Sequence, residues 1–216
     1  MKATDWDKYY AQPFAAATLT RRITTARLLG HMQRWLQTNN PSIVELGGAN
    51  SCFVSALYQQ LSPENYLAID NNRHGLSLLA ARCASLPGLC VMEDDVLSPQ
   101  QHAEADLVFS VGLVEHFDEA GTARAIANHY RYVRPGGLVI ISFPTPTWLY
   151  RTVRWLAEGA GKWRFPDERP LTFAEVATPM LAHGELLAQD LIWPIMLTQG
   201  LWVGRKHLSP ESVTKA

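Results

Sequence analysis

The chain has 216 residues, which is long enough to bury the core of one α/β domain, and its 47% hydrophobic and 18% charged residues are typical of a soluble globular protein. Its formal net charge of -1 excludes a global basic field of the kind that draws proteins onto nucleic acid or anionic membranes. It has neither an apolar leader nor an apolar run long enough to span a bilayer, so we expect a single cytoplasmic domain over residues 1–216.

The first region, residues 1–41, predicts a helical cap. It begins with the aromatic-rich stretch "DWDKYYAQPF", continues as a helical pattern from Ile23 to Leu36, and ends before Pro41, which cannot continue a helix. Tyr9, Tyr10 and Arg21 are candidates for closing over a bound ligand.

Residues 42–143 alternate short apolar runs with segments of helical length. The runs predict strands at 42–46, 65–70, 88–92, 105–111 and 137–143, the last of them after the turn "RPGG". The intervening segments predict helices at 50–61, 72–85 and 119–133. This alternation predicts a parallel sheet with helices on both faces.

The third region, residues 144–183, is rich in Trp, Arg, Pro and Gly, and we interpret it as an insertion ahead of two last strands at 184–207. Its stretch 147–158 predicts an amphipathic lid helix with Trp148, Arg151 and Trp155 as candidate substrate contacts. Two alternatives are a helix packed on the domain and a helix in weak contact with a membrane surface. Helical spacing assigns Leu149, Val153 and Leu156 to one stripe and Arg151, Arg154 and Glu158 to the opposite face.

The three cysteines, Cys52, Cys83 and Cys90, form neither an even set nor a paired spacing. This pattern argues against a disulfide framework and against a zinc site. We therefore expect reduced core residues and no metal site.

In a doubly wound sheet a ligand lies beyond the carboxyl ends of the strands, so the residues that follow each strand are the informative ones. After the first strand, "ELGGANS" holds Glu45, Gly47, Gly48 and Ala49 in a tight turn. Glycine permits a close approach of ligand to backbone, and we expect the N–H groups of this turn to face the ligand. The alternative is a plain turn.

After the second strand come Asp70 and Asn71. The Asp70 carboxylate can accept both hydroxyls of a ribose, or it can cap the following helix. After the third strand, "MEDDVL" brings Asp94, Asp95 and Val96, where a carboxylate can receive an adenine amino group while the apolar side chain packs on the ring. The alternative for this stretch is a solvated acidic loop.

After the fourth strand comes "SVGLVEHF". We expect Ser110, Val111 and Gly112 to face the ligand. Glu115 and His116 are candidates for acid–base catalysis or substrate contact, and the alternative for the histidine is a structural role.

This order of glycine turn, two strand-end acids and post-strand-four segment resembles the class I S-adenosylmethionine-dependent methyltransferases. The resemblance covers about 42–143 and, more weakly, 184–207, where "ELLAQDLI" and "TQGLWVGRK" are similar to the family's last two strands. The family's first motif is commonly acid-x-Gly-x-Gly-x-Gly, whereas Ala49 and Ser51 occupy two of those glycine positions here. The resemblance implies a Rossmann-like sheet in the order 3-2-1-4-5-7-6 with an antiparallel last strand, S-adenosylmethionine as cofactor and S-adenosylhomocysteine as product.

The expected function is methyl transfer to a small-molecule or lipid- or sugar-linked acceptor, with no nucleic-acid partner. A ligand that carries adenosine but no pyrophosphate needs a close backbone approach and no three-glycine cradle. An alternative is a non-catalytic binding or scaffold protein of the same fold. A nicotinamide-dependent oxidoreductase fits less well, because the chain lacks G-x-G-x-x-G and a Tyr followed four residues later by Lys.

Overall fold

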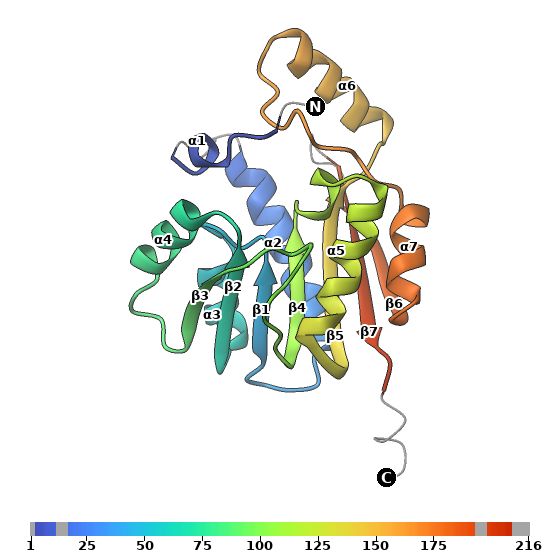
Figure 1. Ribbon diagram of the computed structural model, residues 1–216. Helices are drawn as coiled ribbons and strands as arrows, with labels where there is room; N and C mark the ends of the chain where they lie inside the picture. The colour runs from blue at the N-terminus through green and yellow to red at the C-terminus, as the bar shows by residue number, and fades with distance from the viewer. Residues whose placement is uncertain (1–2, 12–16, 193–197, 209–216) are drawn as a thin grey trace.

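The computed structural model describes residues 3–11, 17–192 and 198–208, and their strands form one seven-stranded sheet in the order β3-β2-β1-β4-β5-β7-β6 (Figure 1). The strands are β1 (Ser42–Leu46), β2 (Asn65–Asp70), β3 (Leu89–Glu93), β4 (Ala105–Val111), β5 (Val133–Pro144), β6 (Gly184–Ile192) and β7 (Gln199–Lys206). Strands β1 to β5 pair in parallel, and β7 runs antiparallel to both of its neighbours. The predicted fold class and strand order are confirmed.

Helices cover both faces of the sheet because the central parallel strands are apolar on both sides. The helices are α1 (Trp6–Ala11), α2 (Ala17–Trp35), α3 (Val54–Leu61), α4 (Arg73–Arg82), α5 (Glu119–Tyr132), α6 (Trp148–Gly159) and α7 (Phe173–Leu181), with a 3-10 turn η1 (Val114–His116). Helices α2, α3 and α4 contribute to one apolar core and α5 and α7 to the other. None of the helices in the described part of the chain is long and apolar enough to cross a bilayer.

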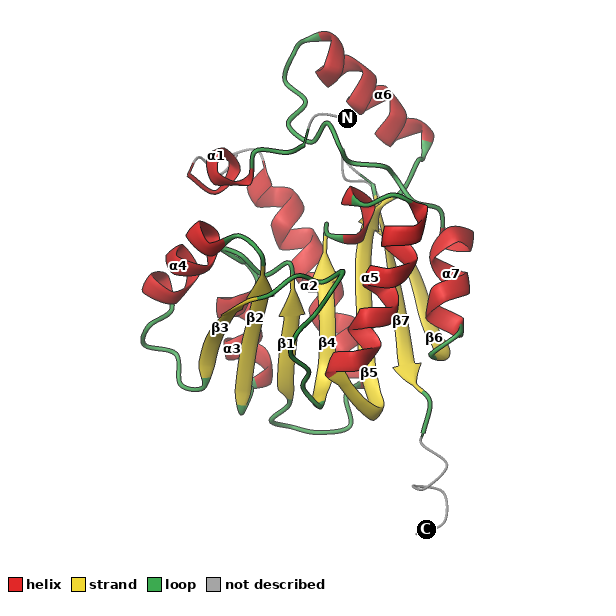
Figure 2. Cartoon of the chain, viewed as in Figure 1, coloured by secondary structure: helices red, strands yellow, loops and turns green. Residues whose placement is uncertain are grey.

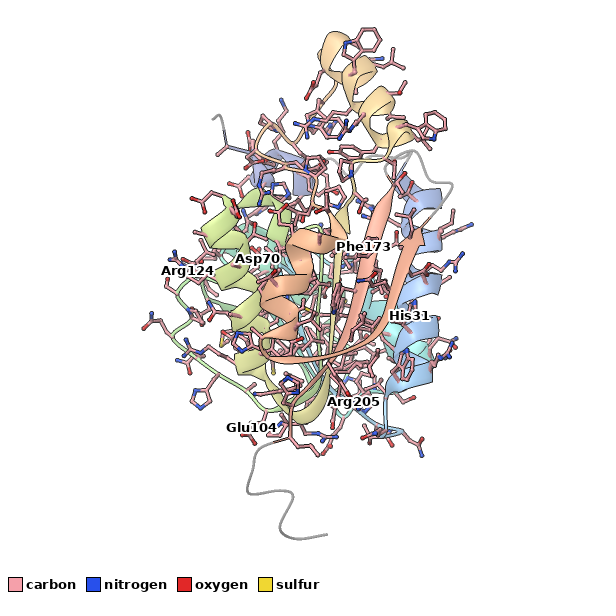
Figure 3. All side chains as sticks on the ribbon, turned by 90° about the vertical axis from the view of Figure 1, so that its right-hand side faces the viewer. His31, Asp70, Glu104, Arg124, Phe173 and Arg205 are labelled. Carbon is pink, nitrogen blue, oxygen red and sulfur yellow. The ribbon has the colours of Figure 1, made fainter. Side chains whose placement is uncertain are left out.

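The two ends of the sheet differ. Helices α1 and α6 lie at the end towards which β1, β2 and β4 point (Figure 2). Asp70 lies towards that end, whereas Glu104 and Arg205 lie at the opposite one (Figure 3). Helices α1 and α6 therefore cover the end of the sheet at which the parallel strands have their carboxyl ends.

Several predicted boundaries are wrong. Helix α3 begins at Val54 instead of residue 50, because Asn50 adopts a positive φ of 48° that a right-handed helix cannot contain. The turn "RPGG" is part of β5, where a register irregularity against β4 accommodates Gly136 at φ 74°.

Region 144–183 contains a helix that the sequence analysis did not predict. Helix α7 begins after Thr172, whose hydroxyl accepts the Glu175 amide, and it packs beside α5 as part of the core. Only the first part of this region, with α6, lies beyond the sheet.

All three cysteines are free, as predicted. Cys83 is buried, but Cys52 and Cys90 are exposed, so the prediction of three core cysteines is wrong for two of them. Cys52 lies in the turn after β1 and Cys90 on the edge strand β3, where neighbouring elements cover less of the chain.

Candidate active site

The turn after β1 lies at the point where the strand order reverses, between β1 and β4. Gly47 adopts a φ of 72°, and the amides of Gly47 and Gly48 both donate to the Ile69 carbonyl, at 2.8 and 3.1 Å. The Ala49 amide donates to Asp70 Oδ2 at 3.0 Å. The expectation that these N–H groups face a ligand is therefore wrong, because the adjacent strand β2 satisfies them. A ligand can therefore approach the backbone of the turn closely, but the paired N–H groups are not available to bind a phosphate.

The turn is in contact with the loop that follows β4. A Cβ on Gly47 would lie 3.1 Å from Leu113 Cδ1, so only glycine leaves this contact undisturbed. The loop itself begins at Gly112, which has a φ of 70° and whose amide donates to the Ser142 carbonyl at 3.0 Å. No sequence pattern indicated Leu113, since a single apolar side chain in a loop belongs to no periodic run.

Glu45 is buried beneath the turn and stabilises it through hydrogen bonds. Its carboxylate accepts the hydroxyls of Ser51 at 2.8 Å and of Tyr66 at 2.5 Å. Burial raises the pKa of Glu45 to about 7. Both oxygens have protein partners, and contact of Glu45 with a cofactor stays a prediction.

Asp70 ends β2 directly beside the turn. Its Oδ2 accepts the Ala49 amide and its Oδ1 accepts the Asn72 amide at 2.8 Å. Burial raises the pKa of Asp70. The cap of α4 is Asn72, whose side chain accepts the Gly75 amide at 2.6 Å, so the capping alternative for Asp70 is excluded. Each oxygen of a carboxylate accepts two hydrogen bonds, which leaves capacity for a ligand hydroxyl pair.

Helix α1 covers this edge of the sheet. A Cβ on Gly75 would lie 2.9 Å from a ring carbon of Tyr10, and burial, followed by the nearby charge of Asp70, raises the pKa of Tyr10. Asn72 donates to Asp7 at 2.8 Å. An open surface pocket adjoins the contact and is lined by Asp7, Asn71, Asn72, Arg73, His74 and Ser77. Tyr10 therefore lies beside Asp70, and its closure over a ligand stays a prediction.

The loop after β3 is ordered by its own acids. Asp94 accepts the amides of Gln100, Asp95 and Gln101, and these bonds outweigh desolvation and lower its pKa. Asp95 accepts the Leu97 amide at 2.8 Å. Beside them, Val96 packs against the core of the α5 face, and its packing on an adenine ring stays a prediction.

Ser110 does not face the site. Its hydroxyl lies 2.8 Å from His129 Nε2, and both side chains are fully buried between β4 and α5. The expected cofactor contact through this side chain is wrong, because at this point of β4 the side chain points into the core. Val111 packs against the core on the α2 face.

His116 lies at the centre of an aromatic cluster. Its side chain is 9% exposed, and its ring lies edge-on to Trp6 with the centroids 4.9 Å apart and 6.0 Å from Phe165. Nδ1 lies 3.0 Å from Oδ1 of Asp167, and Oδ2 of the same carboxylate accepts the Thr4 amide at 3.0 Å. Burial lowers the pKa of His116, although Asp167 opposes that shift.

Tyr9 and Arg21 complete the contact between the N-terminal region and this cluster. Arg21 Nη2 donates to the Tyr9 hydroxyl at 3.4 Å, and the Tyr9 ring lies 5.3 Å from that of Phe165. The sequence analysis missed Thr4, Trp6 and Asp167. Nothing in their spacing indicates the contact, because it joins segments that lie far apart along the chain.

Glu115 is a buried acid beside His116. It is 2% exposed, and its Oε2 has no hydrogen-bond partner among the described residues. Burial, and then the charge of Glu168, raises the pKa of Glu115 well above its ordinary range. Glu168 itself accepts the hydroxyl of Tyr150. Two carboxyl groups, from η1 and from the segment after α6, thus lie close together at the carboxyl end of β4.

Helix α6 forms over the predicted stretch. Arg154 donates to Glu158 Oε1 at 2.7 Å, in agreement with the prediction that these two residues share a face, and it also donates to the Glu168 carbonyl at 2.9 Å. Tyr150 is buried, whereas Trp148, Trp155 and Leu156 are 70%, 71% and 57% exposed. Substrate contact by Trp148, Arg151 and Trp155 stays a prediction.

Known proteins resemble this chain both in one family model and in their folds. A family model described as a methyltransferase domain matches residues 43–137. Magnesium protoporphyrin IX methyltransferase from Synechocystis PCC 6803, solved with bound SAH, superposes with a TM-score of 0.72 at 11% identity, over 93% of this chain and 92% of that one. N-methyltransferase NodS from Bradyrhizobium japonicum WM9, also in complex with SAH, gives 0.65 at 15% identity, over 84% and 86%.

A complex between the Trm112 methyltransferase activator of Haloferax volcanii and a methyltransferase contains a further match, with a TM-score of 0.72 at 16% identity, over 96% of this chain and 100% of that one. Identities this low show a shared fold. No curated protein matches this sequence. Residues 43–137 match the methyltransferase domain family, and the sheet has the strand order that the resemblance implied. The matched domain and the fold are those of the class I S-adenosylmethionine-dependent methyltransferases.

Proposed function

We propose that the chain transfers a methyl group from S-adenosylmethionine to a small-molecule acceptor held beside η1. The observation that carries this proposal is the convergence of the ends of β1, β2 and β4 under α1. It brings the Gly47 turn, the Asp70 carboxylate and the loop that leads to His116 to one edge of the sheet. This edge is where ligands of doubly wound sheets bind.

The described residues fit an adenosine ligand that lacks a pyrophosphate. The turn amides are paired within the protein, so the turn offers steric contact and no anion site. Asp70 retains acceptor capacity for ribose hydroxyls. The proposed cofactor contacts are Glu45, Gly47, Gly48, Ala49, Asp70, Asn71, Asp94, Asp95, Val96, Val111 and Gly112.

Bound S-adenosylmethionine supplies the methyl group, whose carbon–sulfur bond breaks with the electron pair left on sulfur as the acceptor atom bonds to the carbon. The protein has to align the acceptor and exclude water. Tyr10 and Trp6 close the edge, while Asp167 fixes the His116 ring through Nδ1. We assign Glu115 and His116 to the acceptor side, next to the loop at Gly112.

A small, partly apolar acceptor suits this location best. The aromatic rings of Trp6, Tyr9 and Phe165 surround His116, and rings of this kind bind apolar and planar groups well. The net charge of -1 gives no overall electrostatic attraction to a polyanionic acceptor such as a nucleic acid. Two structural neighbours support a small-molecule acceptor by their names. One is a magnesium protoporphyrin IX methyltransferase, and the other is an N-methyltransferase.

For helix α6 we propose weak contact with an anionic membrane surface. The exposed side chains of Trp148, Trp155 and Leu156 lie beyond the sheet with the exposed Arg151 among them. Tryptophan and arginine at helical spacing are typical of interfacial helices. One such helix with few cations gives only weak affinity, which would assist an enzyme whose acceptor is delivered from a lipid phase.

Label transfer tests the proposed function. The protein is incubated with methyl-labelled S-adenosylmethionine and, separately, with metabolite, lipid, RNA and protein fractions of a cell extract. We expect label in the metabolite or lipid fraction only. Label confined to RNA or protein would contradict the acceptor class. Binding of S-adenosylmethionine without any transfer would favour the non-catalytic alternative.

A further inference from the structure

Three potential metal ligands come together at the carboxyl end of β4. Within the described ranges, one ligand atom each from Glu115, His116 and Glu168 lies within 4.8 Å of the others. Ligands at about 2.1 Å from one ion are at most about 4.2 Å apart, so side-chain adjustments of less than about 1 Å would close the group around an ion. We propose that Glu115, His116 and Glu168 bind one divalent transition-metal ion on the acceptor side of the active site.

The unsatisfied oxygen of Glu115 is the strongest support. Glu115 is 2% exposed, its Oε2 has no partner, and no salt bridge to it is found among the described residues. A buried carboxylate without a hydrogen bond or counter-charge is costly, so such groups are usually paired or coordinate a metal. The carboxyl group of Glu168 belongs to the same cluster, so a bound cation would be shared by two acidic groups.

His116 is arranged as metal-binding histidines usually are. Asp167 holds Nδ1 at 3.0 Å and is itself fixed by the Thr4 amide. A carboxylate on one ring nitrogen orients the ring and leaves the other nitrogen free for an ion. Nε2 of His116 has no hydrogen-bond partner among the described residues. Asp167 is therefore a positioning residue for this site.

The ligand set also indicates the class of ion. One imidazole and two carboxylates suit Mn²⁺ or Zn²⁺ better than Ca²⁺, which prefers a shell made of oxygen alone. Three protein ligands leave coordination positions open for water or for an oxygen of the acceptor. This role for the ion rests on the proposed function, and it favours acceptors that present a hydroxyl group. The sequence analysis expected no metal site because the three cysteines show no paired spacing. It did not consider Glu168, which comes from a distant segment and shares no motif with Glu115 and His116.

Direct binding of Mn²⁺ tests the site. The chelator-treated protein is titrated with Mn²⁺ and with Zn²⁺ by calorimetry, and bound Mn²⁺ is examined by electron spin-echo spectroscopy. We expect one ion per chain and a nitrogen coupling from imidazole. Glu115→Gln should weaken binding about tenfold or more, and His116→Ala should also abolish the nitrogen coupling. Asp167→Asn should weaken binding about tenfold or more through loss of the partner on Nδ1.

Glu104→Gln is the matched control, since Glu104 is an exposed acid at the opposite end of the sheet, and it should bind like the wild type. Glu115→Gln keeps the shape of the buried side chain but cannot become a charged metal ligand, so the metal-free variant should melt no lower than the wild type. The proposal is overturned if the folded wild type binds neither ion at about 1 mM, or if both ligand variants bind unchanged. Titration of the same samples with S-adenosylhomocysteine distinguishes failure of the metal site from failure of the proposed function. If the protein binds S-adenosylhomocysteine but no metal, only the metal site is refuted.

Discussion

Replacement of Gly47 by alanine tests the geometry of the turn after β1. Gly47 adopts a φ of 72°, and a left-handed conformation costs a residue with a Cβ roughly 1–2 kcal/mol. The new Cβ would also lie 3.1 Å from Leu113 Cδ1 and 3.3 Å from its Cβ, so Leu113 has to move by a few tenths of an ångström. We expect Gly47→Ala to lower the free energy of unfolding by about 1.5–3 kcal/mol.

Substitutions at two other glycines separate the conformational cost of the positive φ from the cost of the contact with Leu113. Gly161 has a φ of 63° with nothing within 4 Å of its added Cβ, so Gly161→Ala carries the conformational cost alone, about 1–2 kcal/mol. Gly159 lies at the end of α6, has no positive φ and has the same open surroundings, so Gly159→Ala should be neutral or stabilising by up to about 1 kcal/mol.

Urea denaturation of the three variants gives the free energies, and calorimetry with S-adenosylhomocysteine gives the affinities. Only Gly47→Ala should lose affinity, because only its Cβ lies at the junction of β1 and β4. The reasoning fails if Gly47→Ala unfolds and binds like the wild type, or if Gly161→Ala weakens binding equally.

Other variants test the remaining parts of the site. Glu45 has a pKa of about 7 in the folded protein against an ordinary 4.5, so its protonated form favours folding, and the stability it contributes is present below about pH 4.5 and lost as the pH rises through 7. Urea denaturation at pH 5 and pH 8 should show that Glu45→Gln removes up to about 3 kcal/mol of the wild type's pH dependence, and an unchanged dependence would refute the assignment. His116→Ala should lower turnover about tenfold or more with little change in cofactor affinity, and the opposite result would assign it to the cofactor side. Trp148→Ala combined with Trp155→Ala should reduce co-sedimentation with anionic vesicles at an unchanged melting temperature. The control Leu208→Ala, which alters an exposed apolar residue beside Gly136 in β5, should bind like the wild type. Absence of vesicle binding by the wild type refutes the membrane contact.

The sheet could be predicted from the sequence because each central strand is a continuous apolar run between turn residues. The order of the strands followed from the resemblance, since spacing alone leaves several orders open. Helix α7 was missed because "LTFAEV" is short and follows a Pro-rich stretch, so its apolar residues Val176 and Met180 show their purpose only against α5.

Positions directly after strands were predicted better than the partners of their side chains. Asp70 lies beside the glycine turn as expected, because parallel strands end at a common edge. The predicted cofactor contact of Ser110 was wrong because the sequence does not show to which face of β4 this side chain belongs. Asp167 and Glu168 were missed because their contacts with His116 and Glu115 depend on how the segment after α6 folds back, and no local pattern encodes that return.

The binding of S-adenosylhomocysteine tests the central claim most directly. Calorimetry compares the wild type with Asp70→Asn, which retains one acceptor oxygen, and with Glu104→Gln at the opposite end of the sheet. We expect one molecule bound per chain, a loss of about 1.5–3 kcal/mol in Asp70→Asn, and wild-type affinity in Glu104→Gln. A folded wild type that binds neither S-adenosylhomocysteine nor S-adenosylmethionine, or an Asp70→Asn variant with unchanged affinity, would contradict the account.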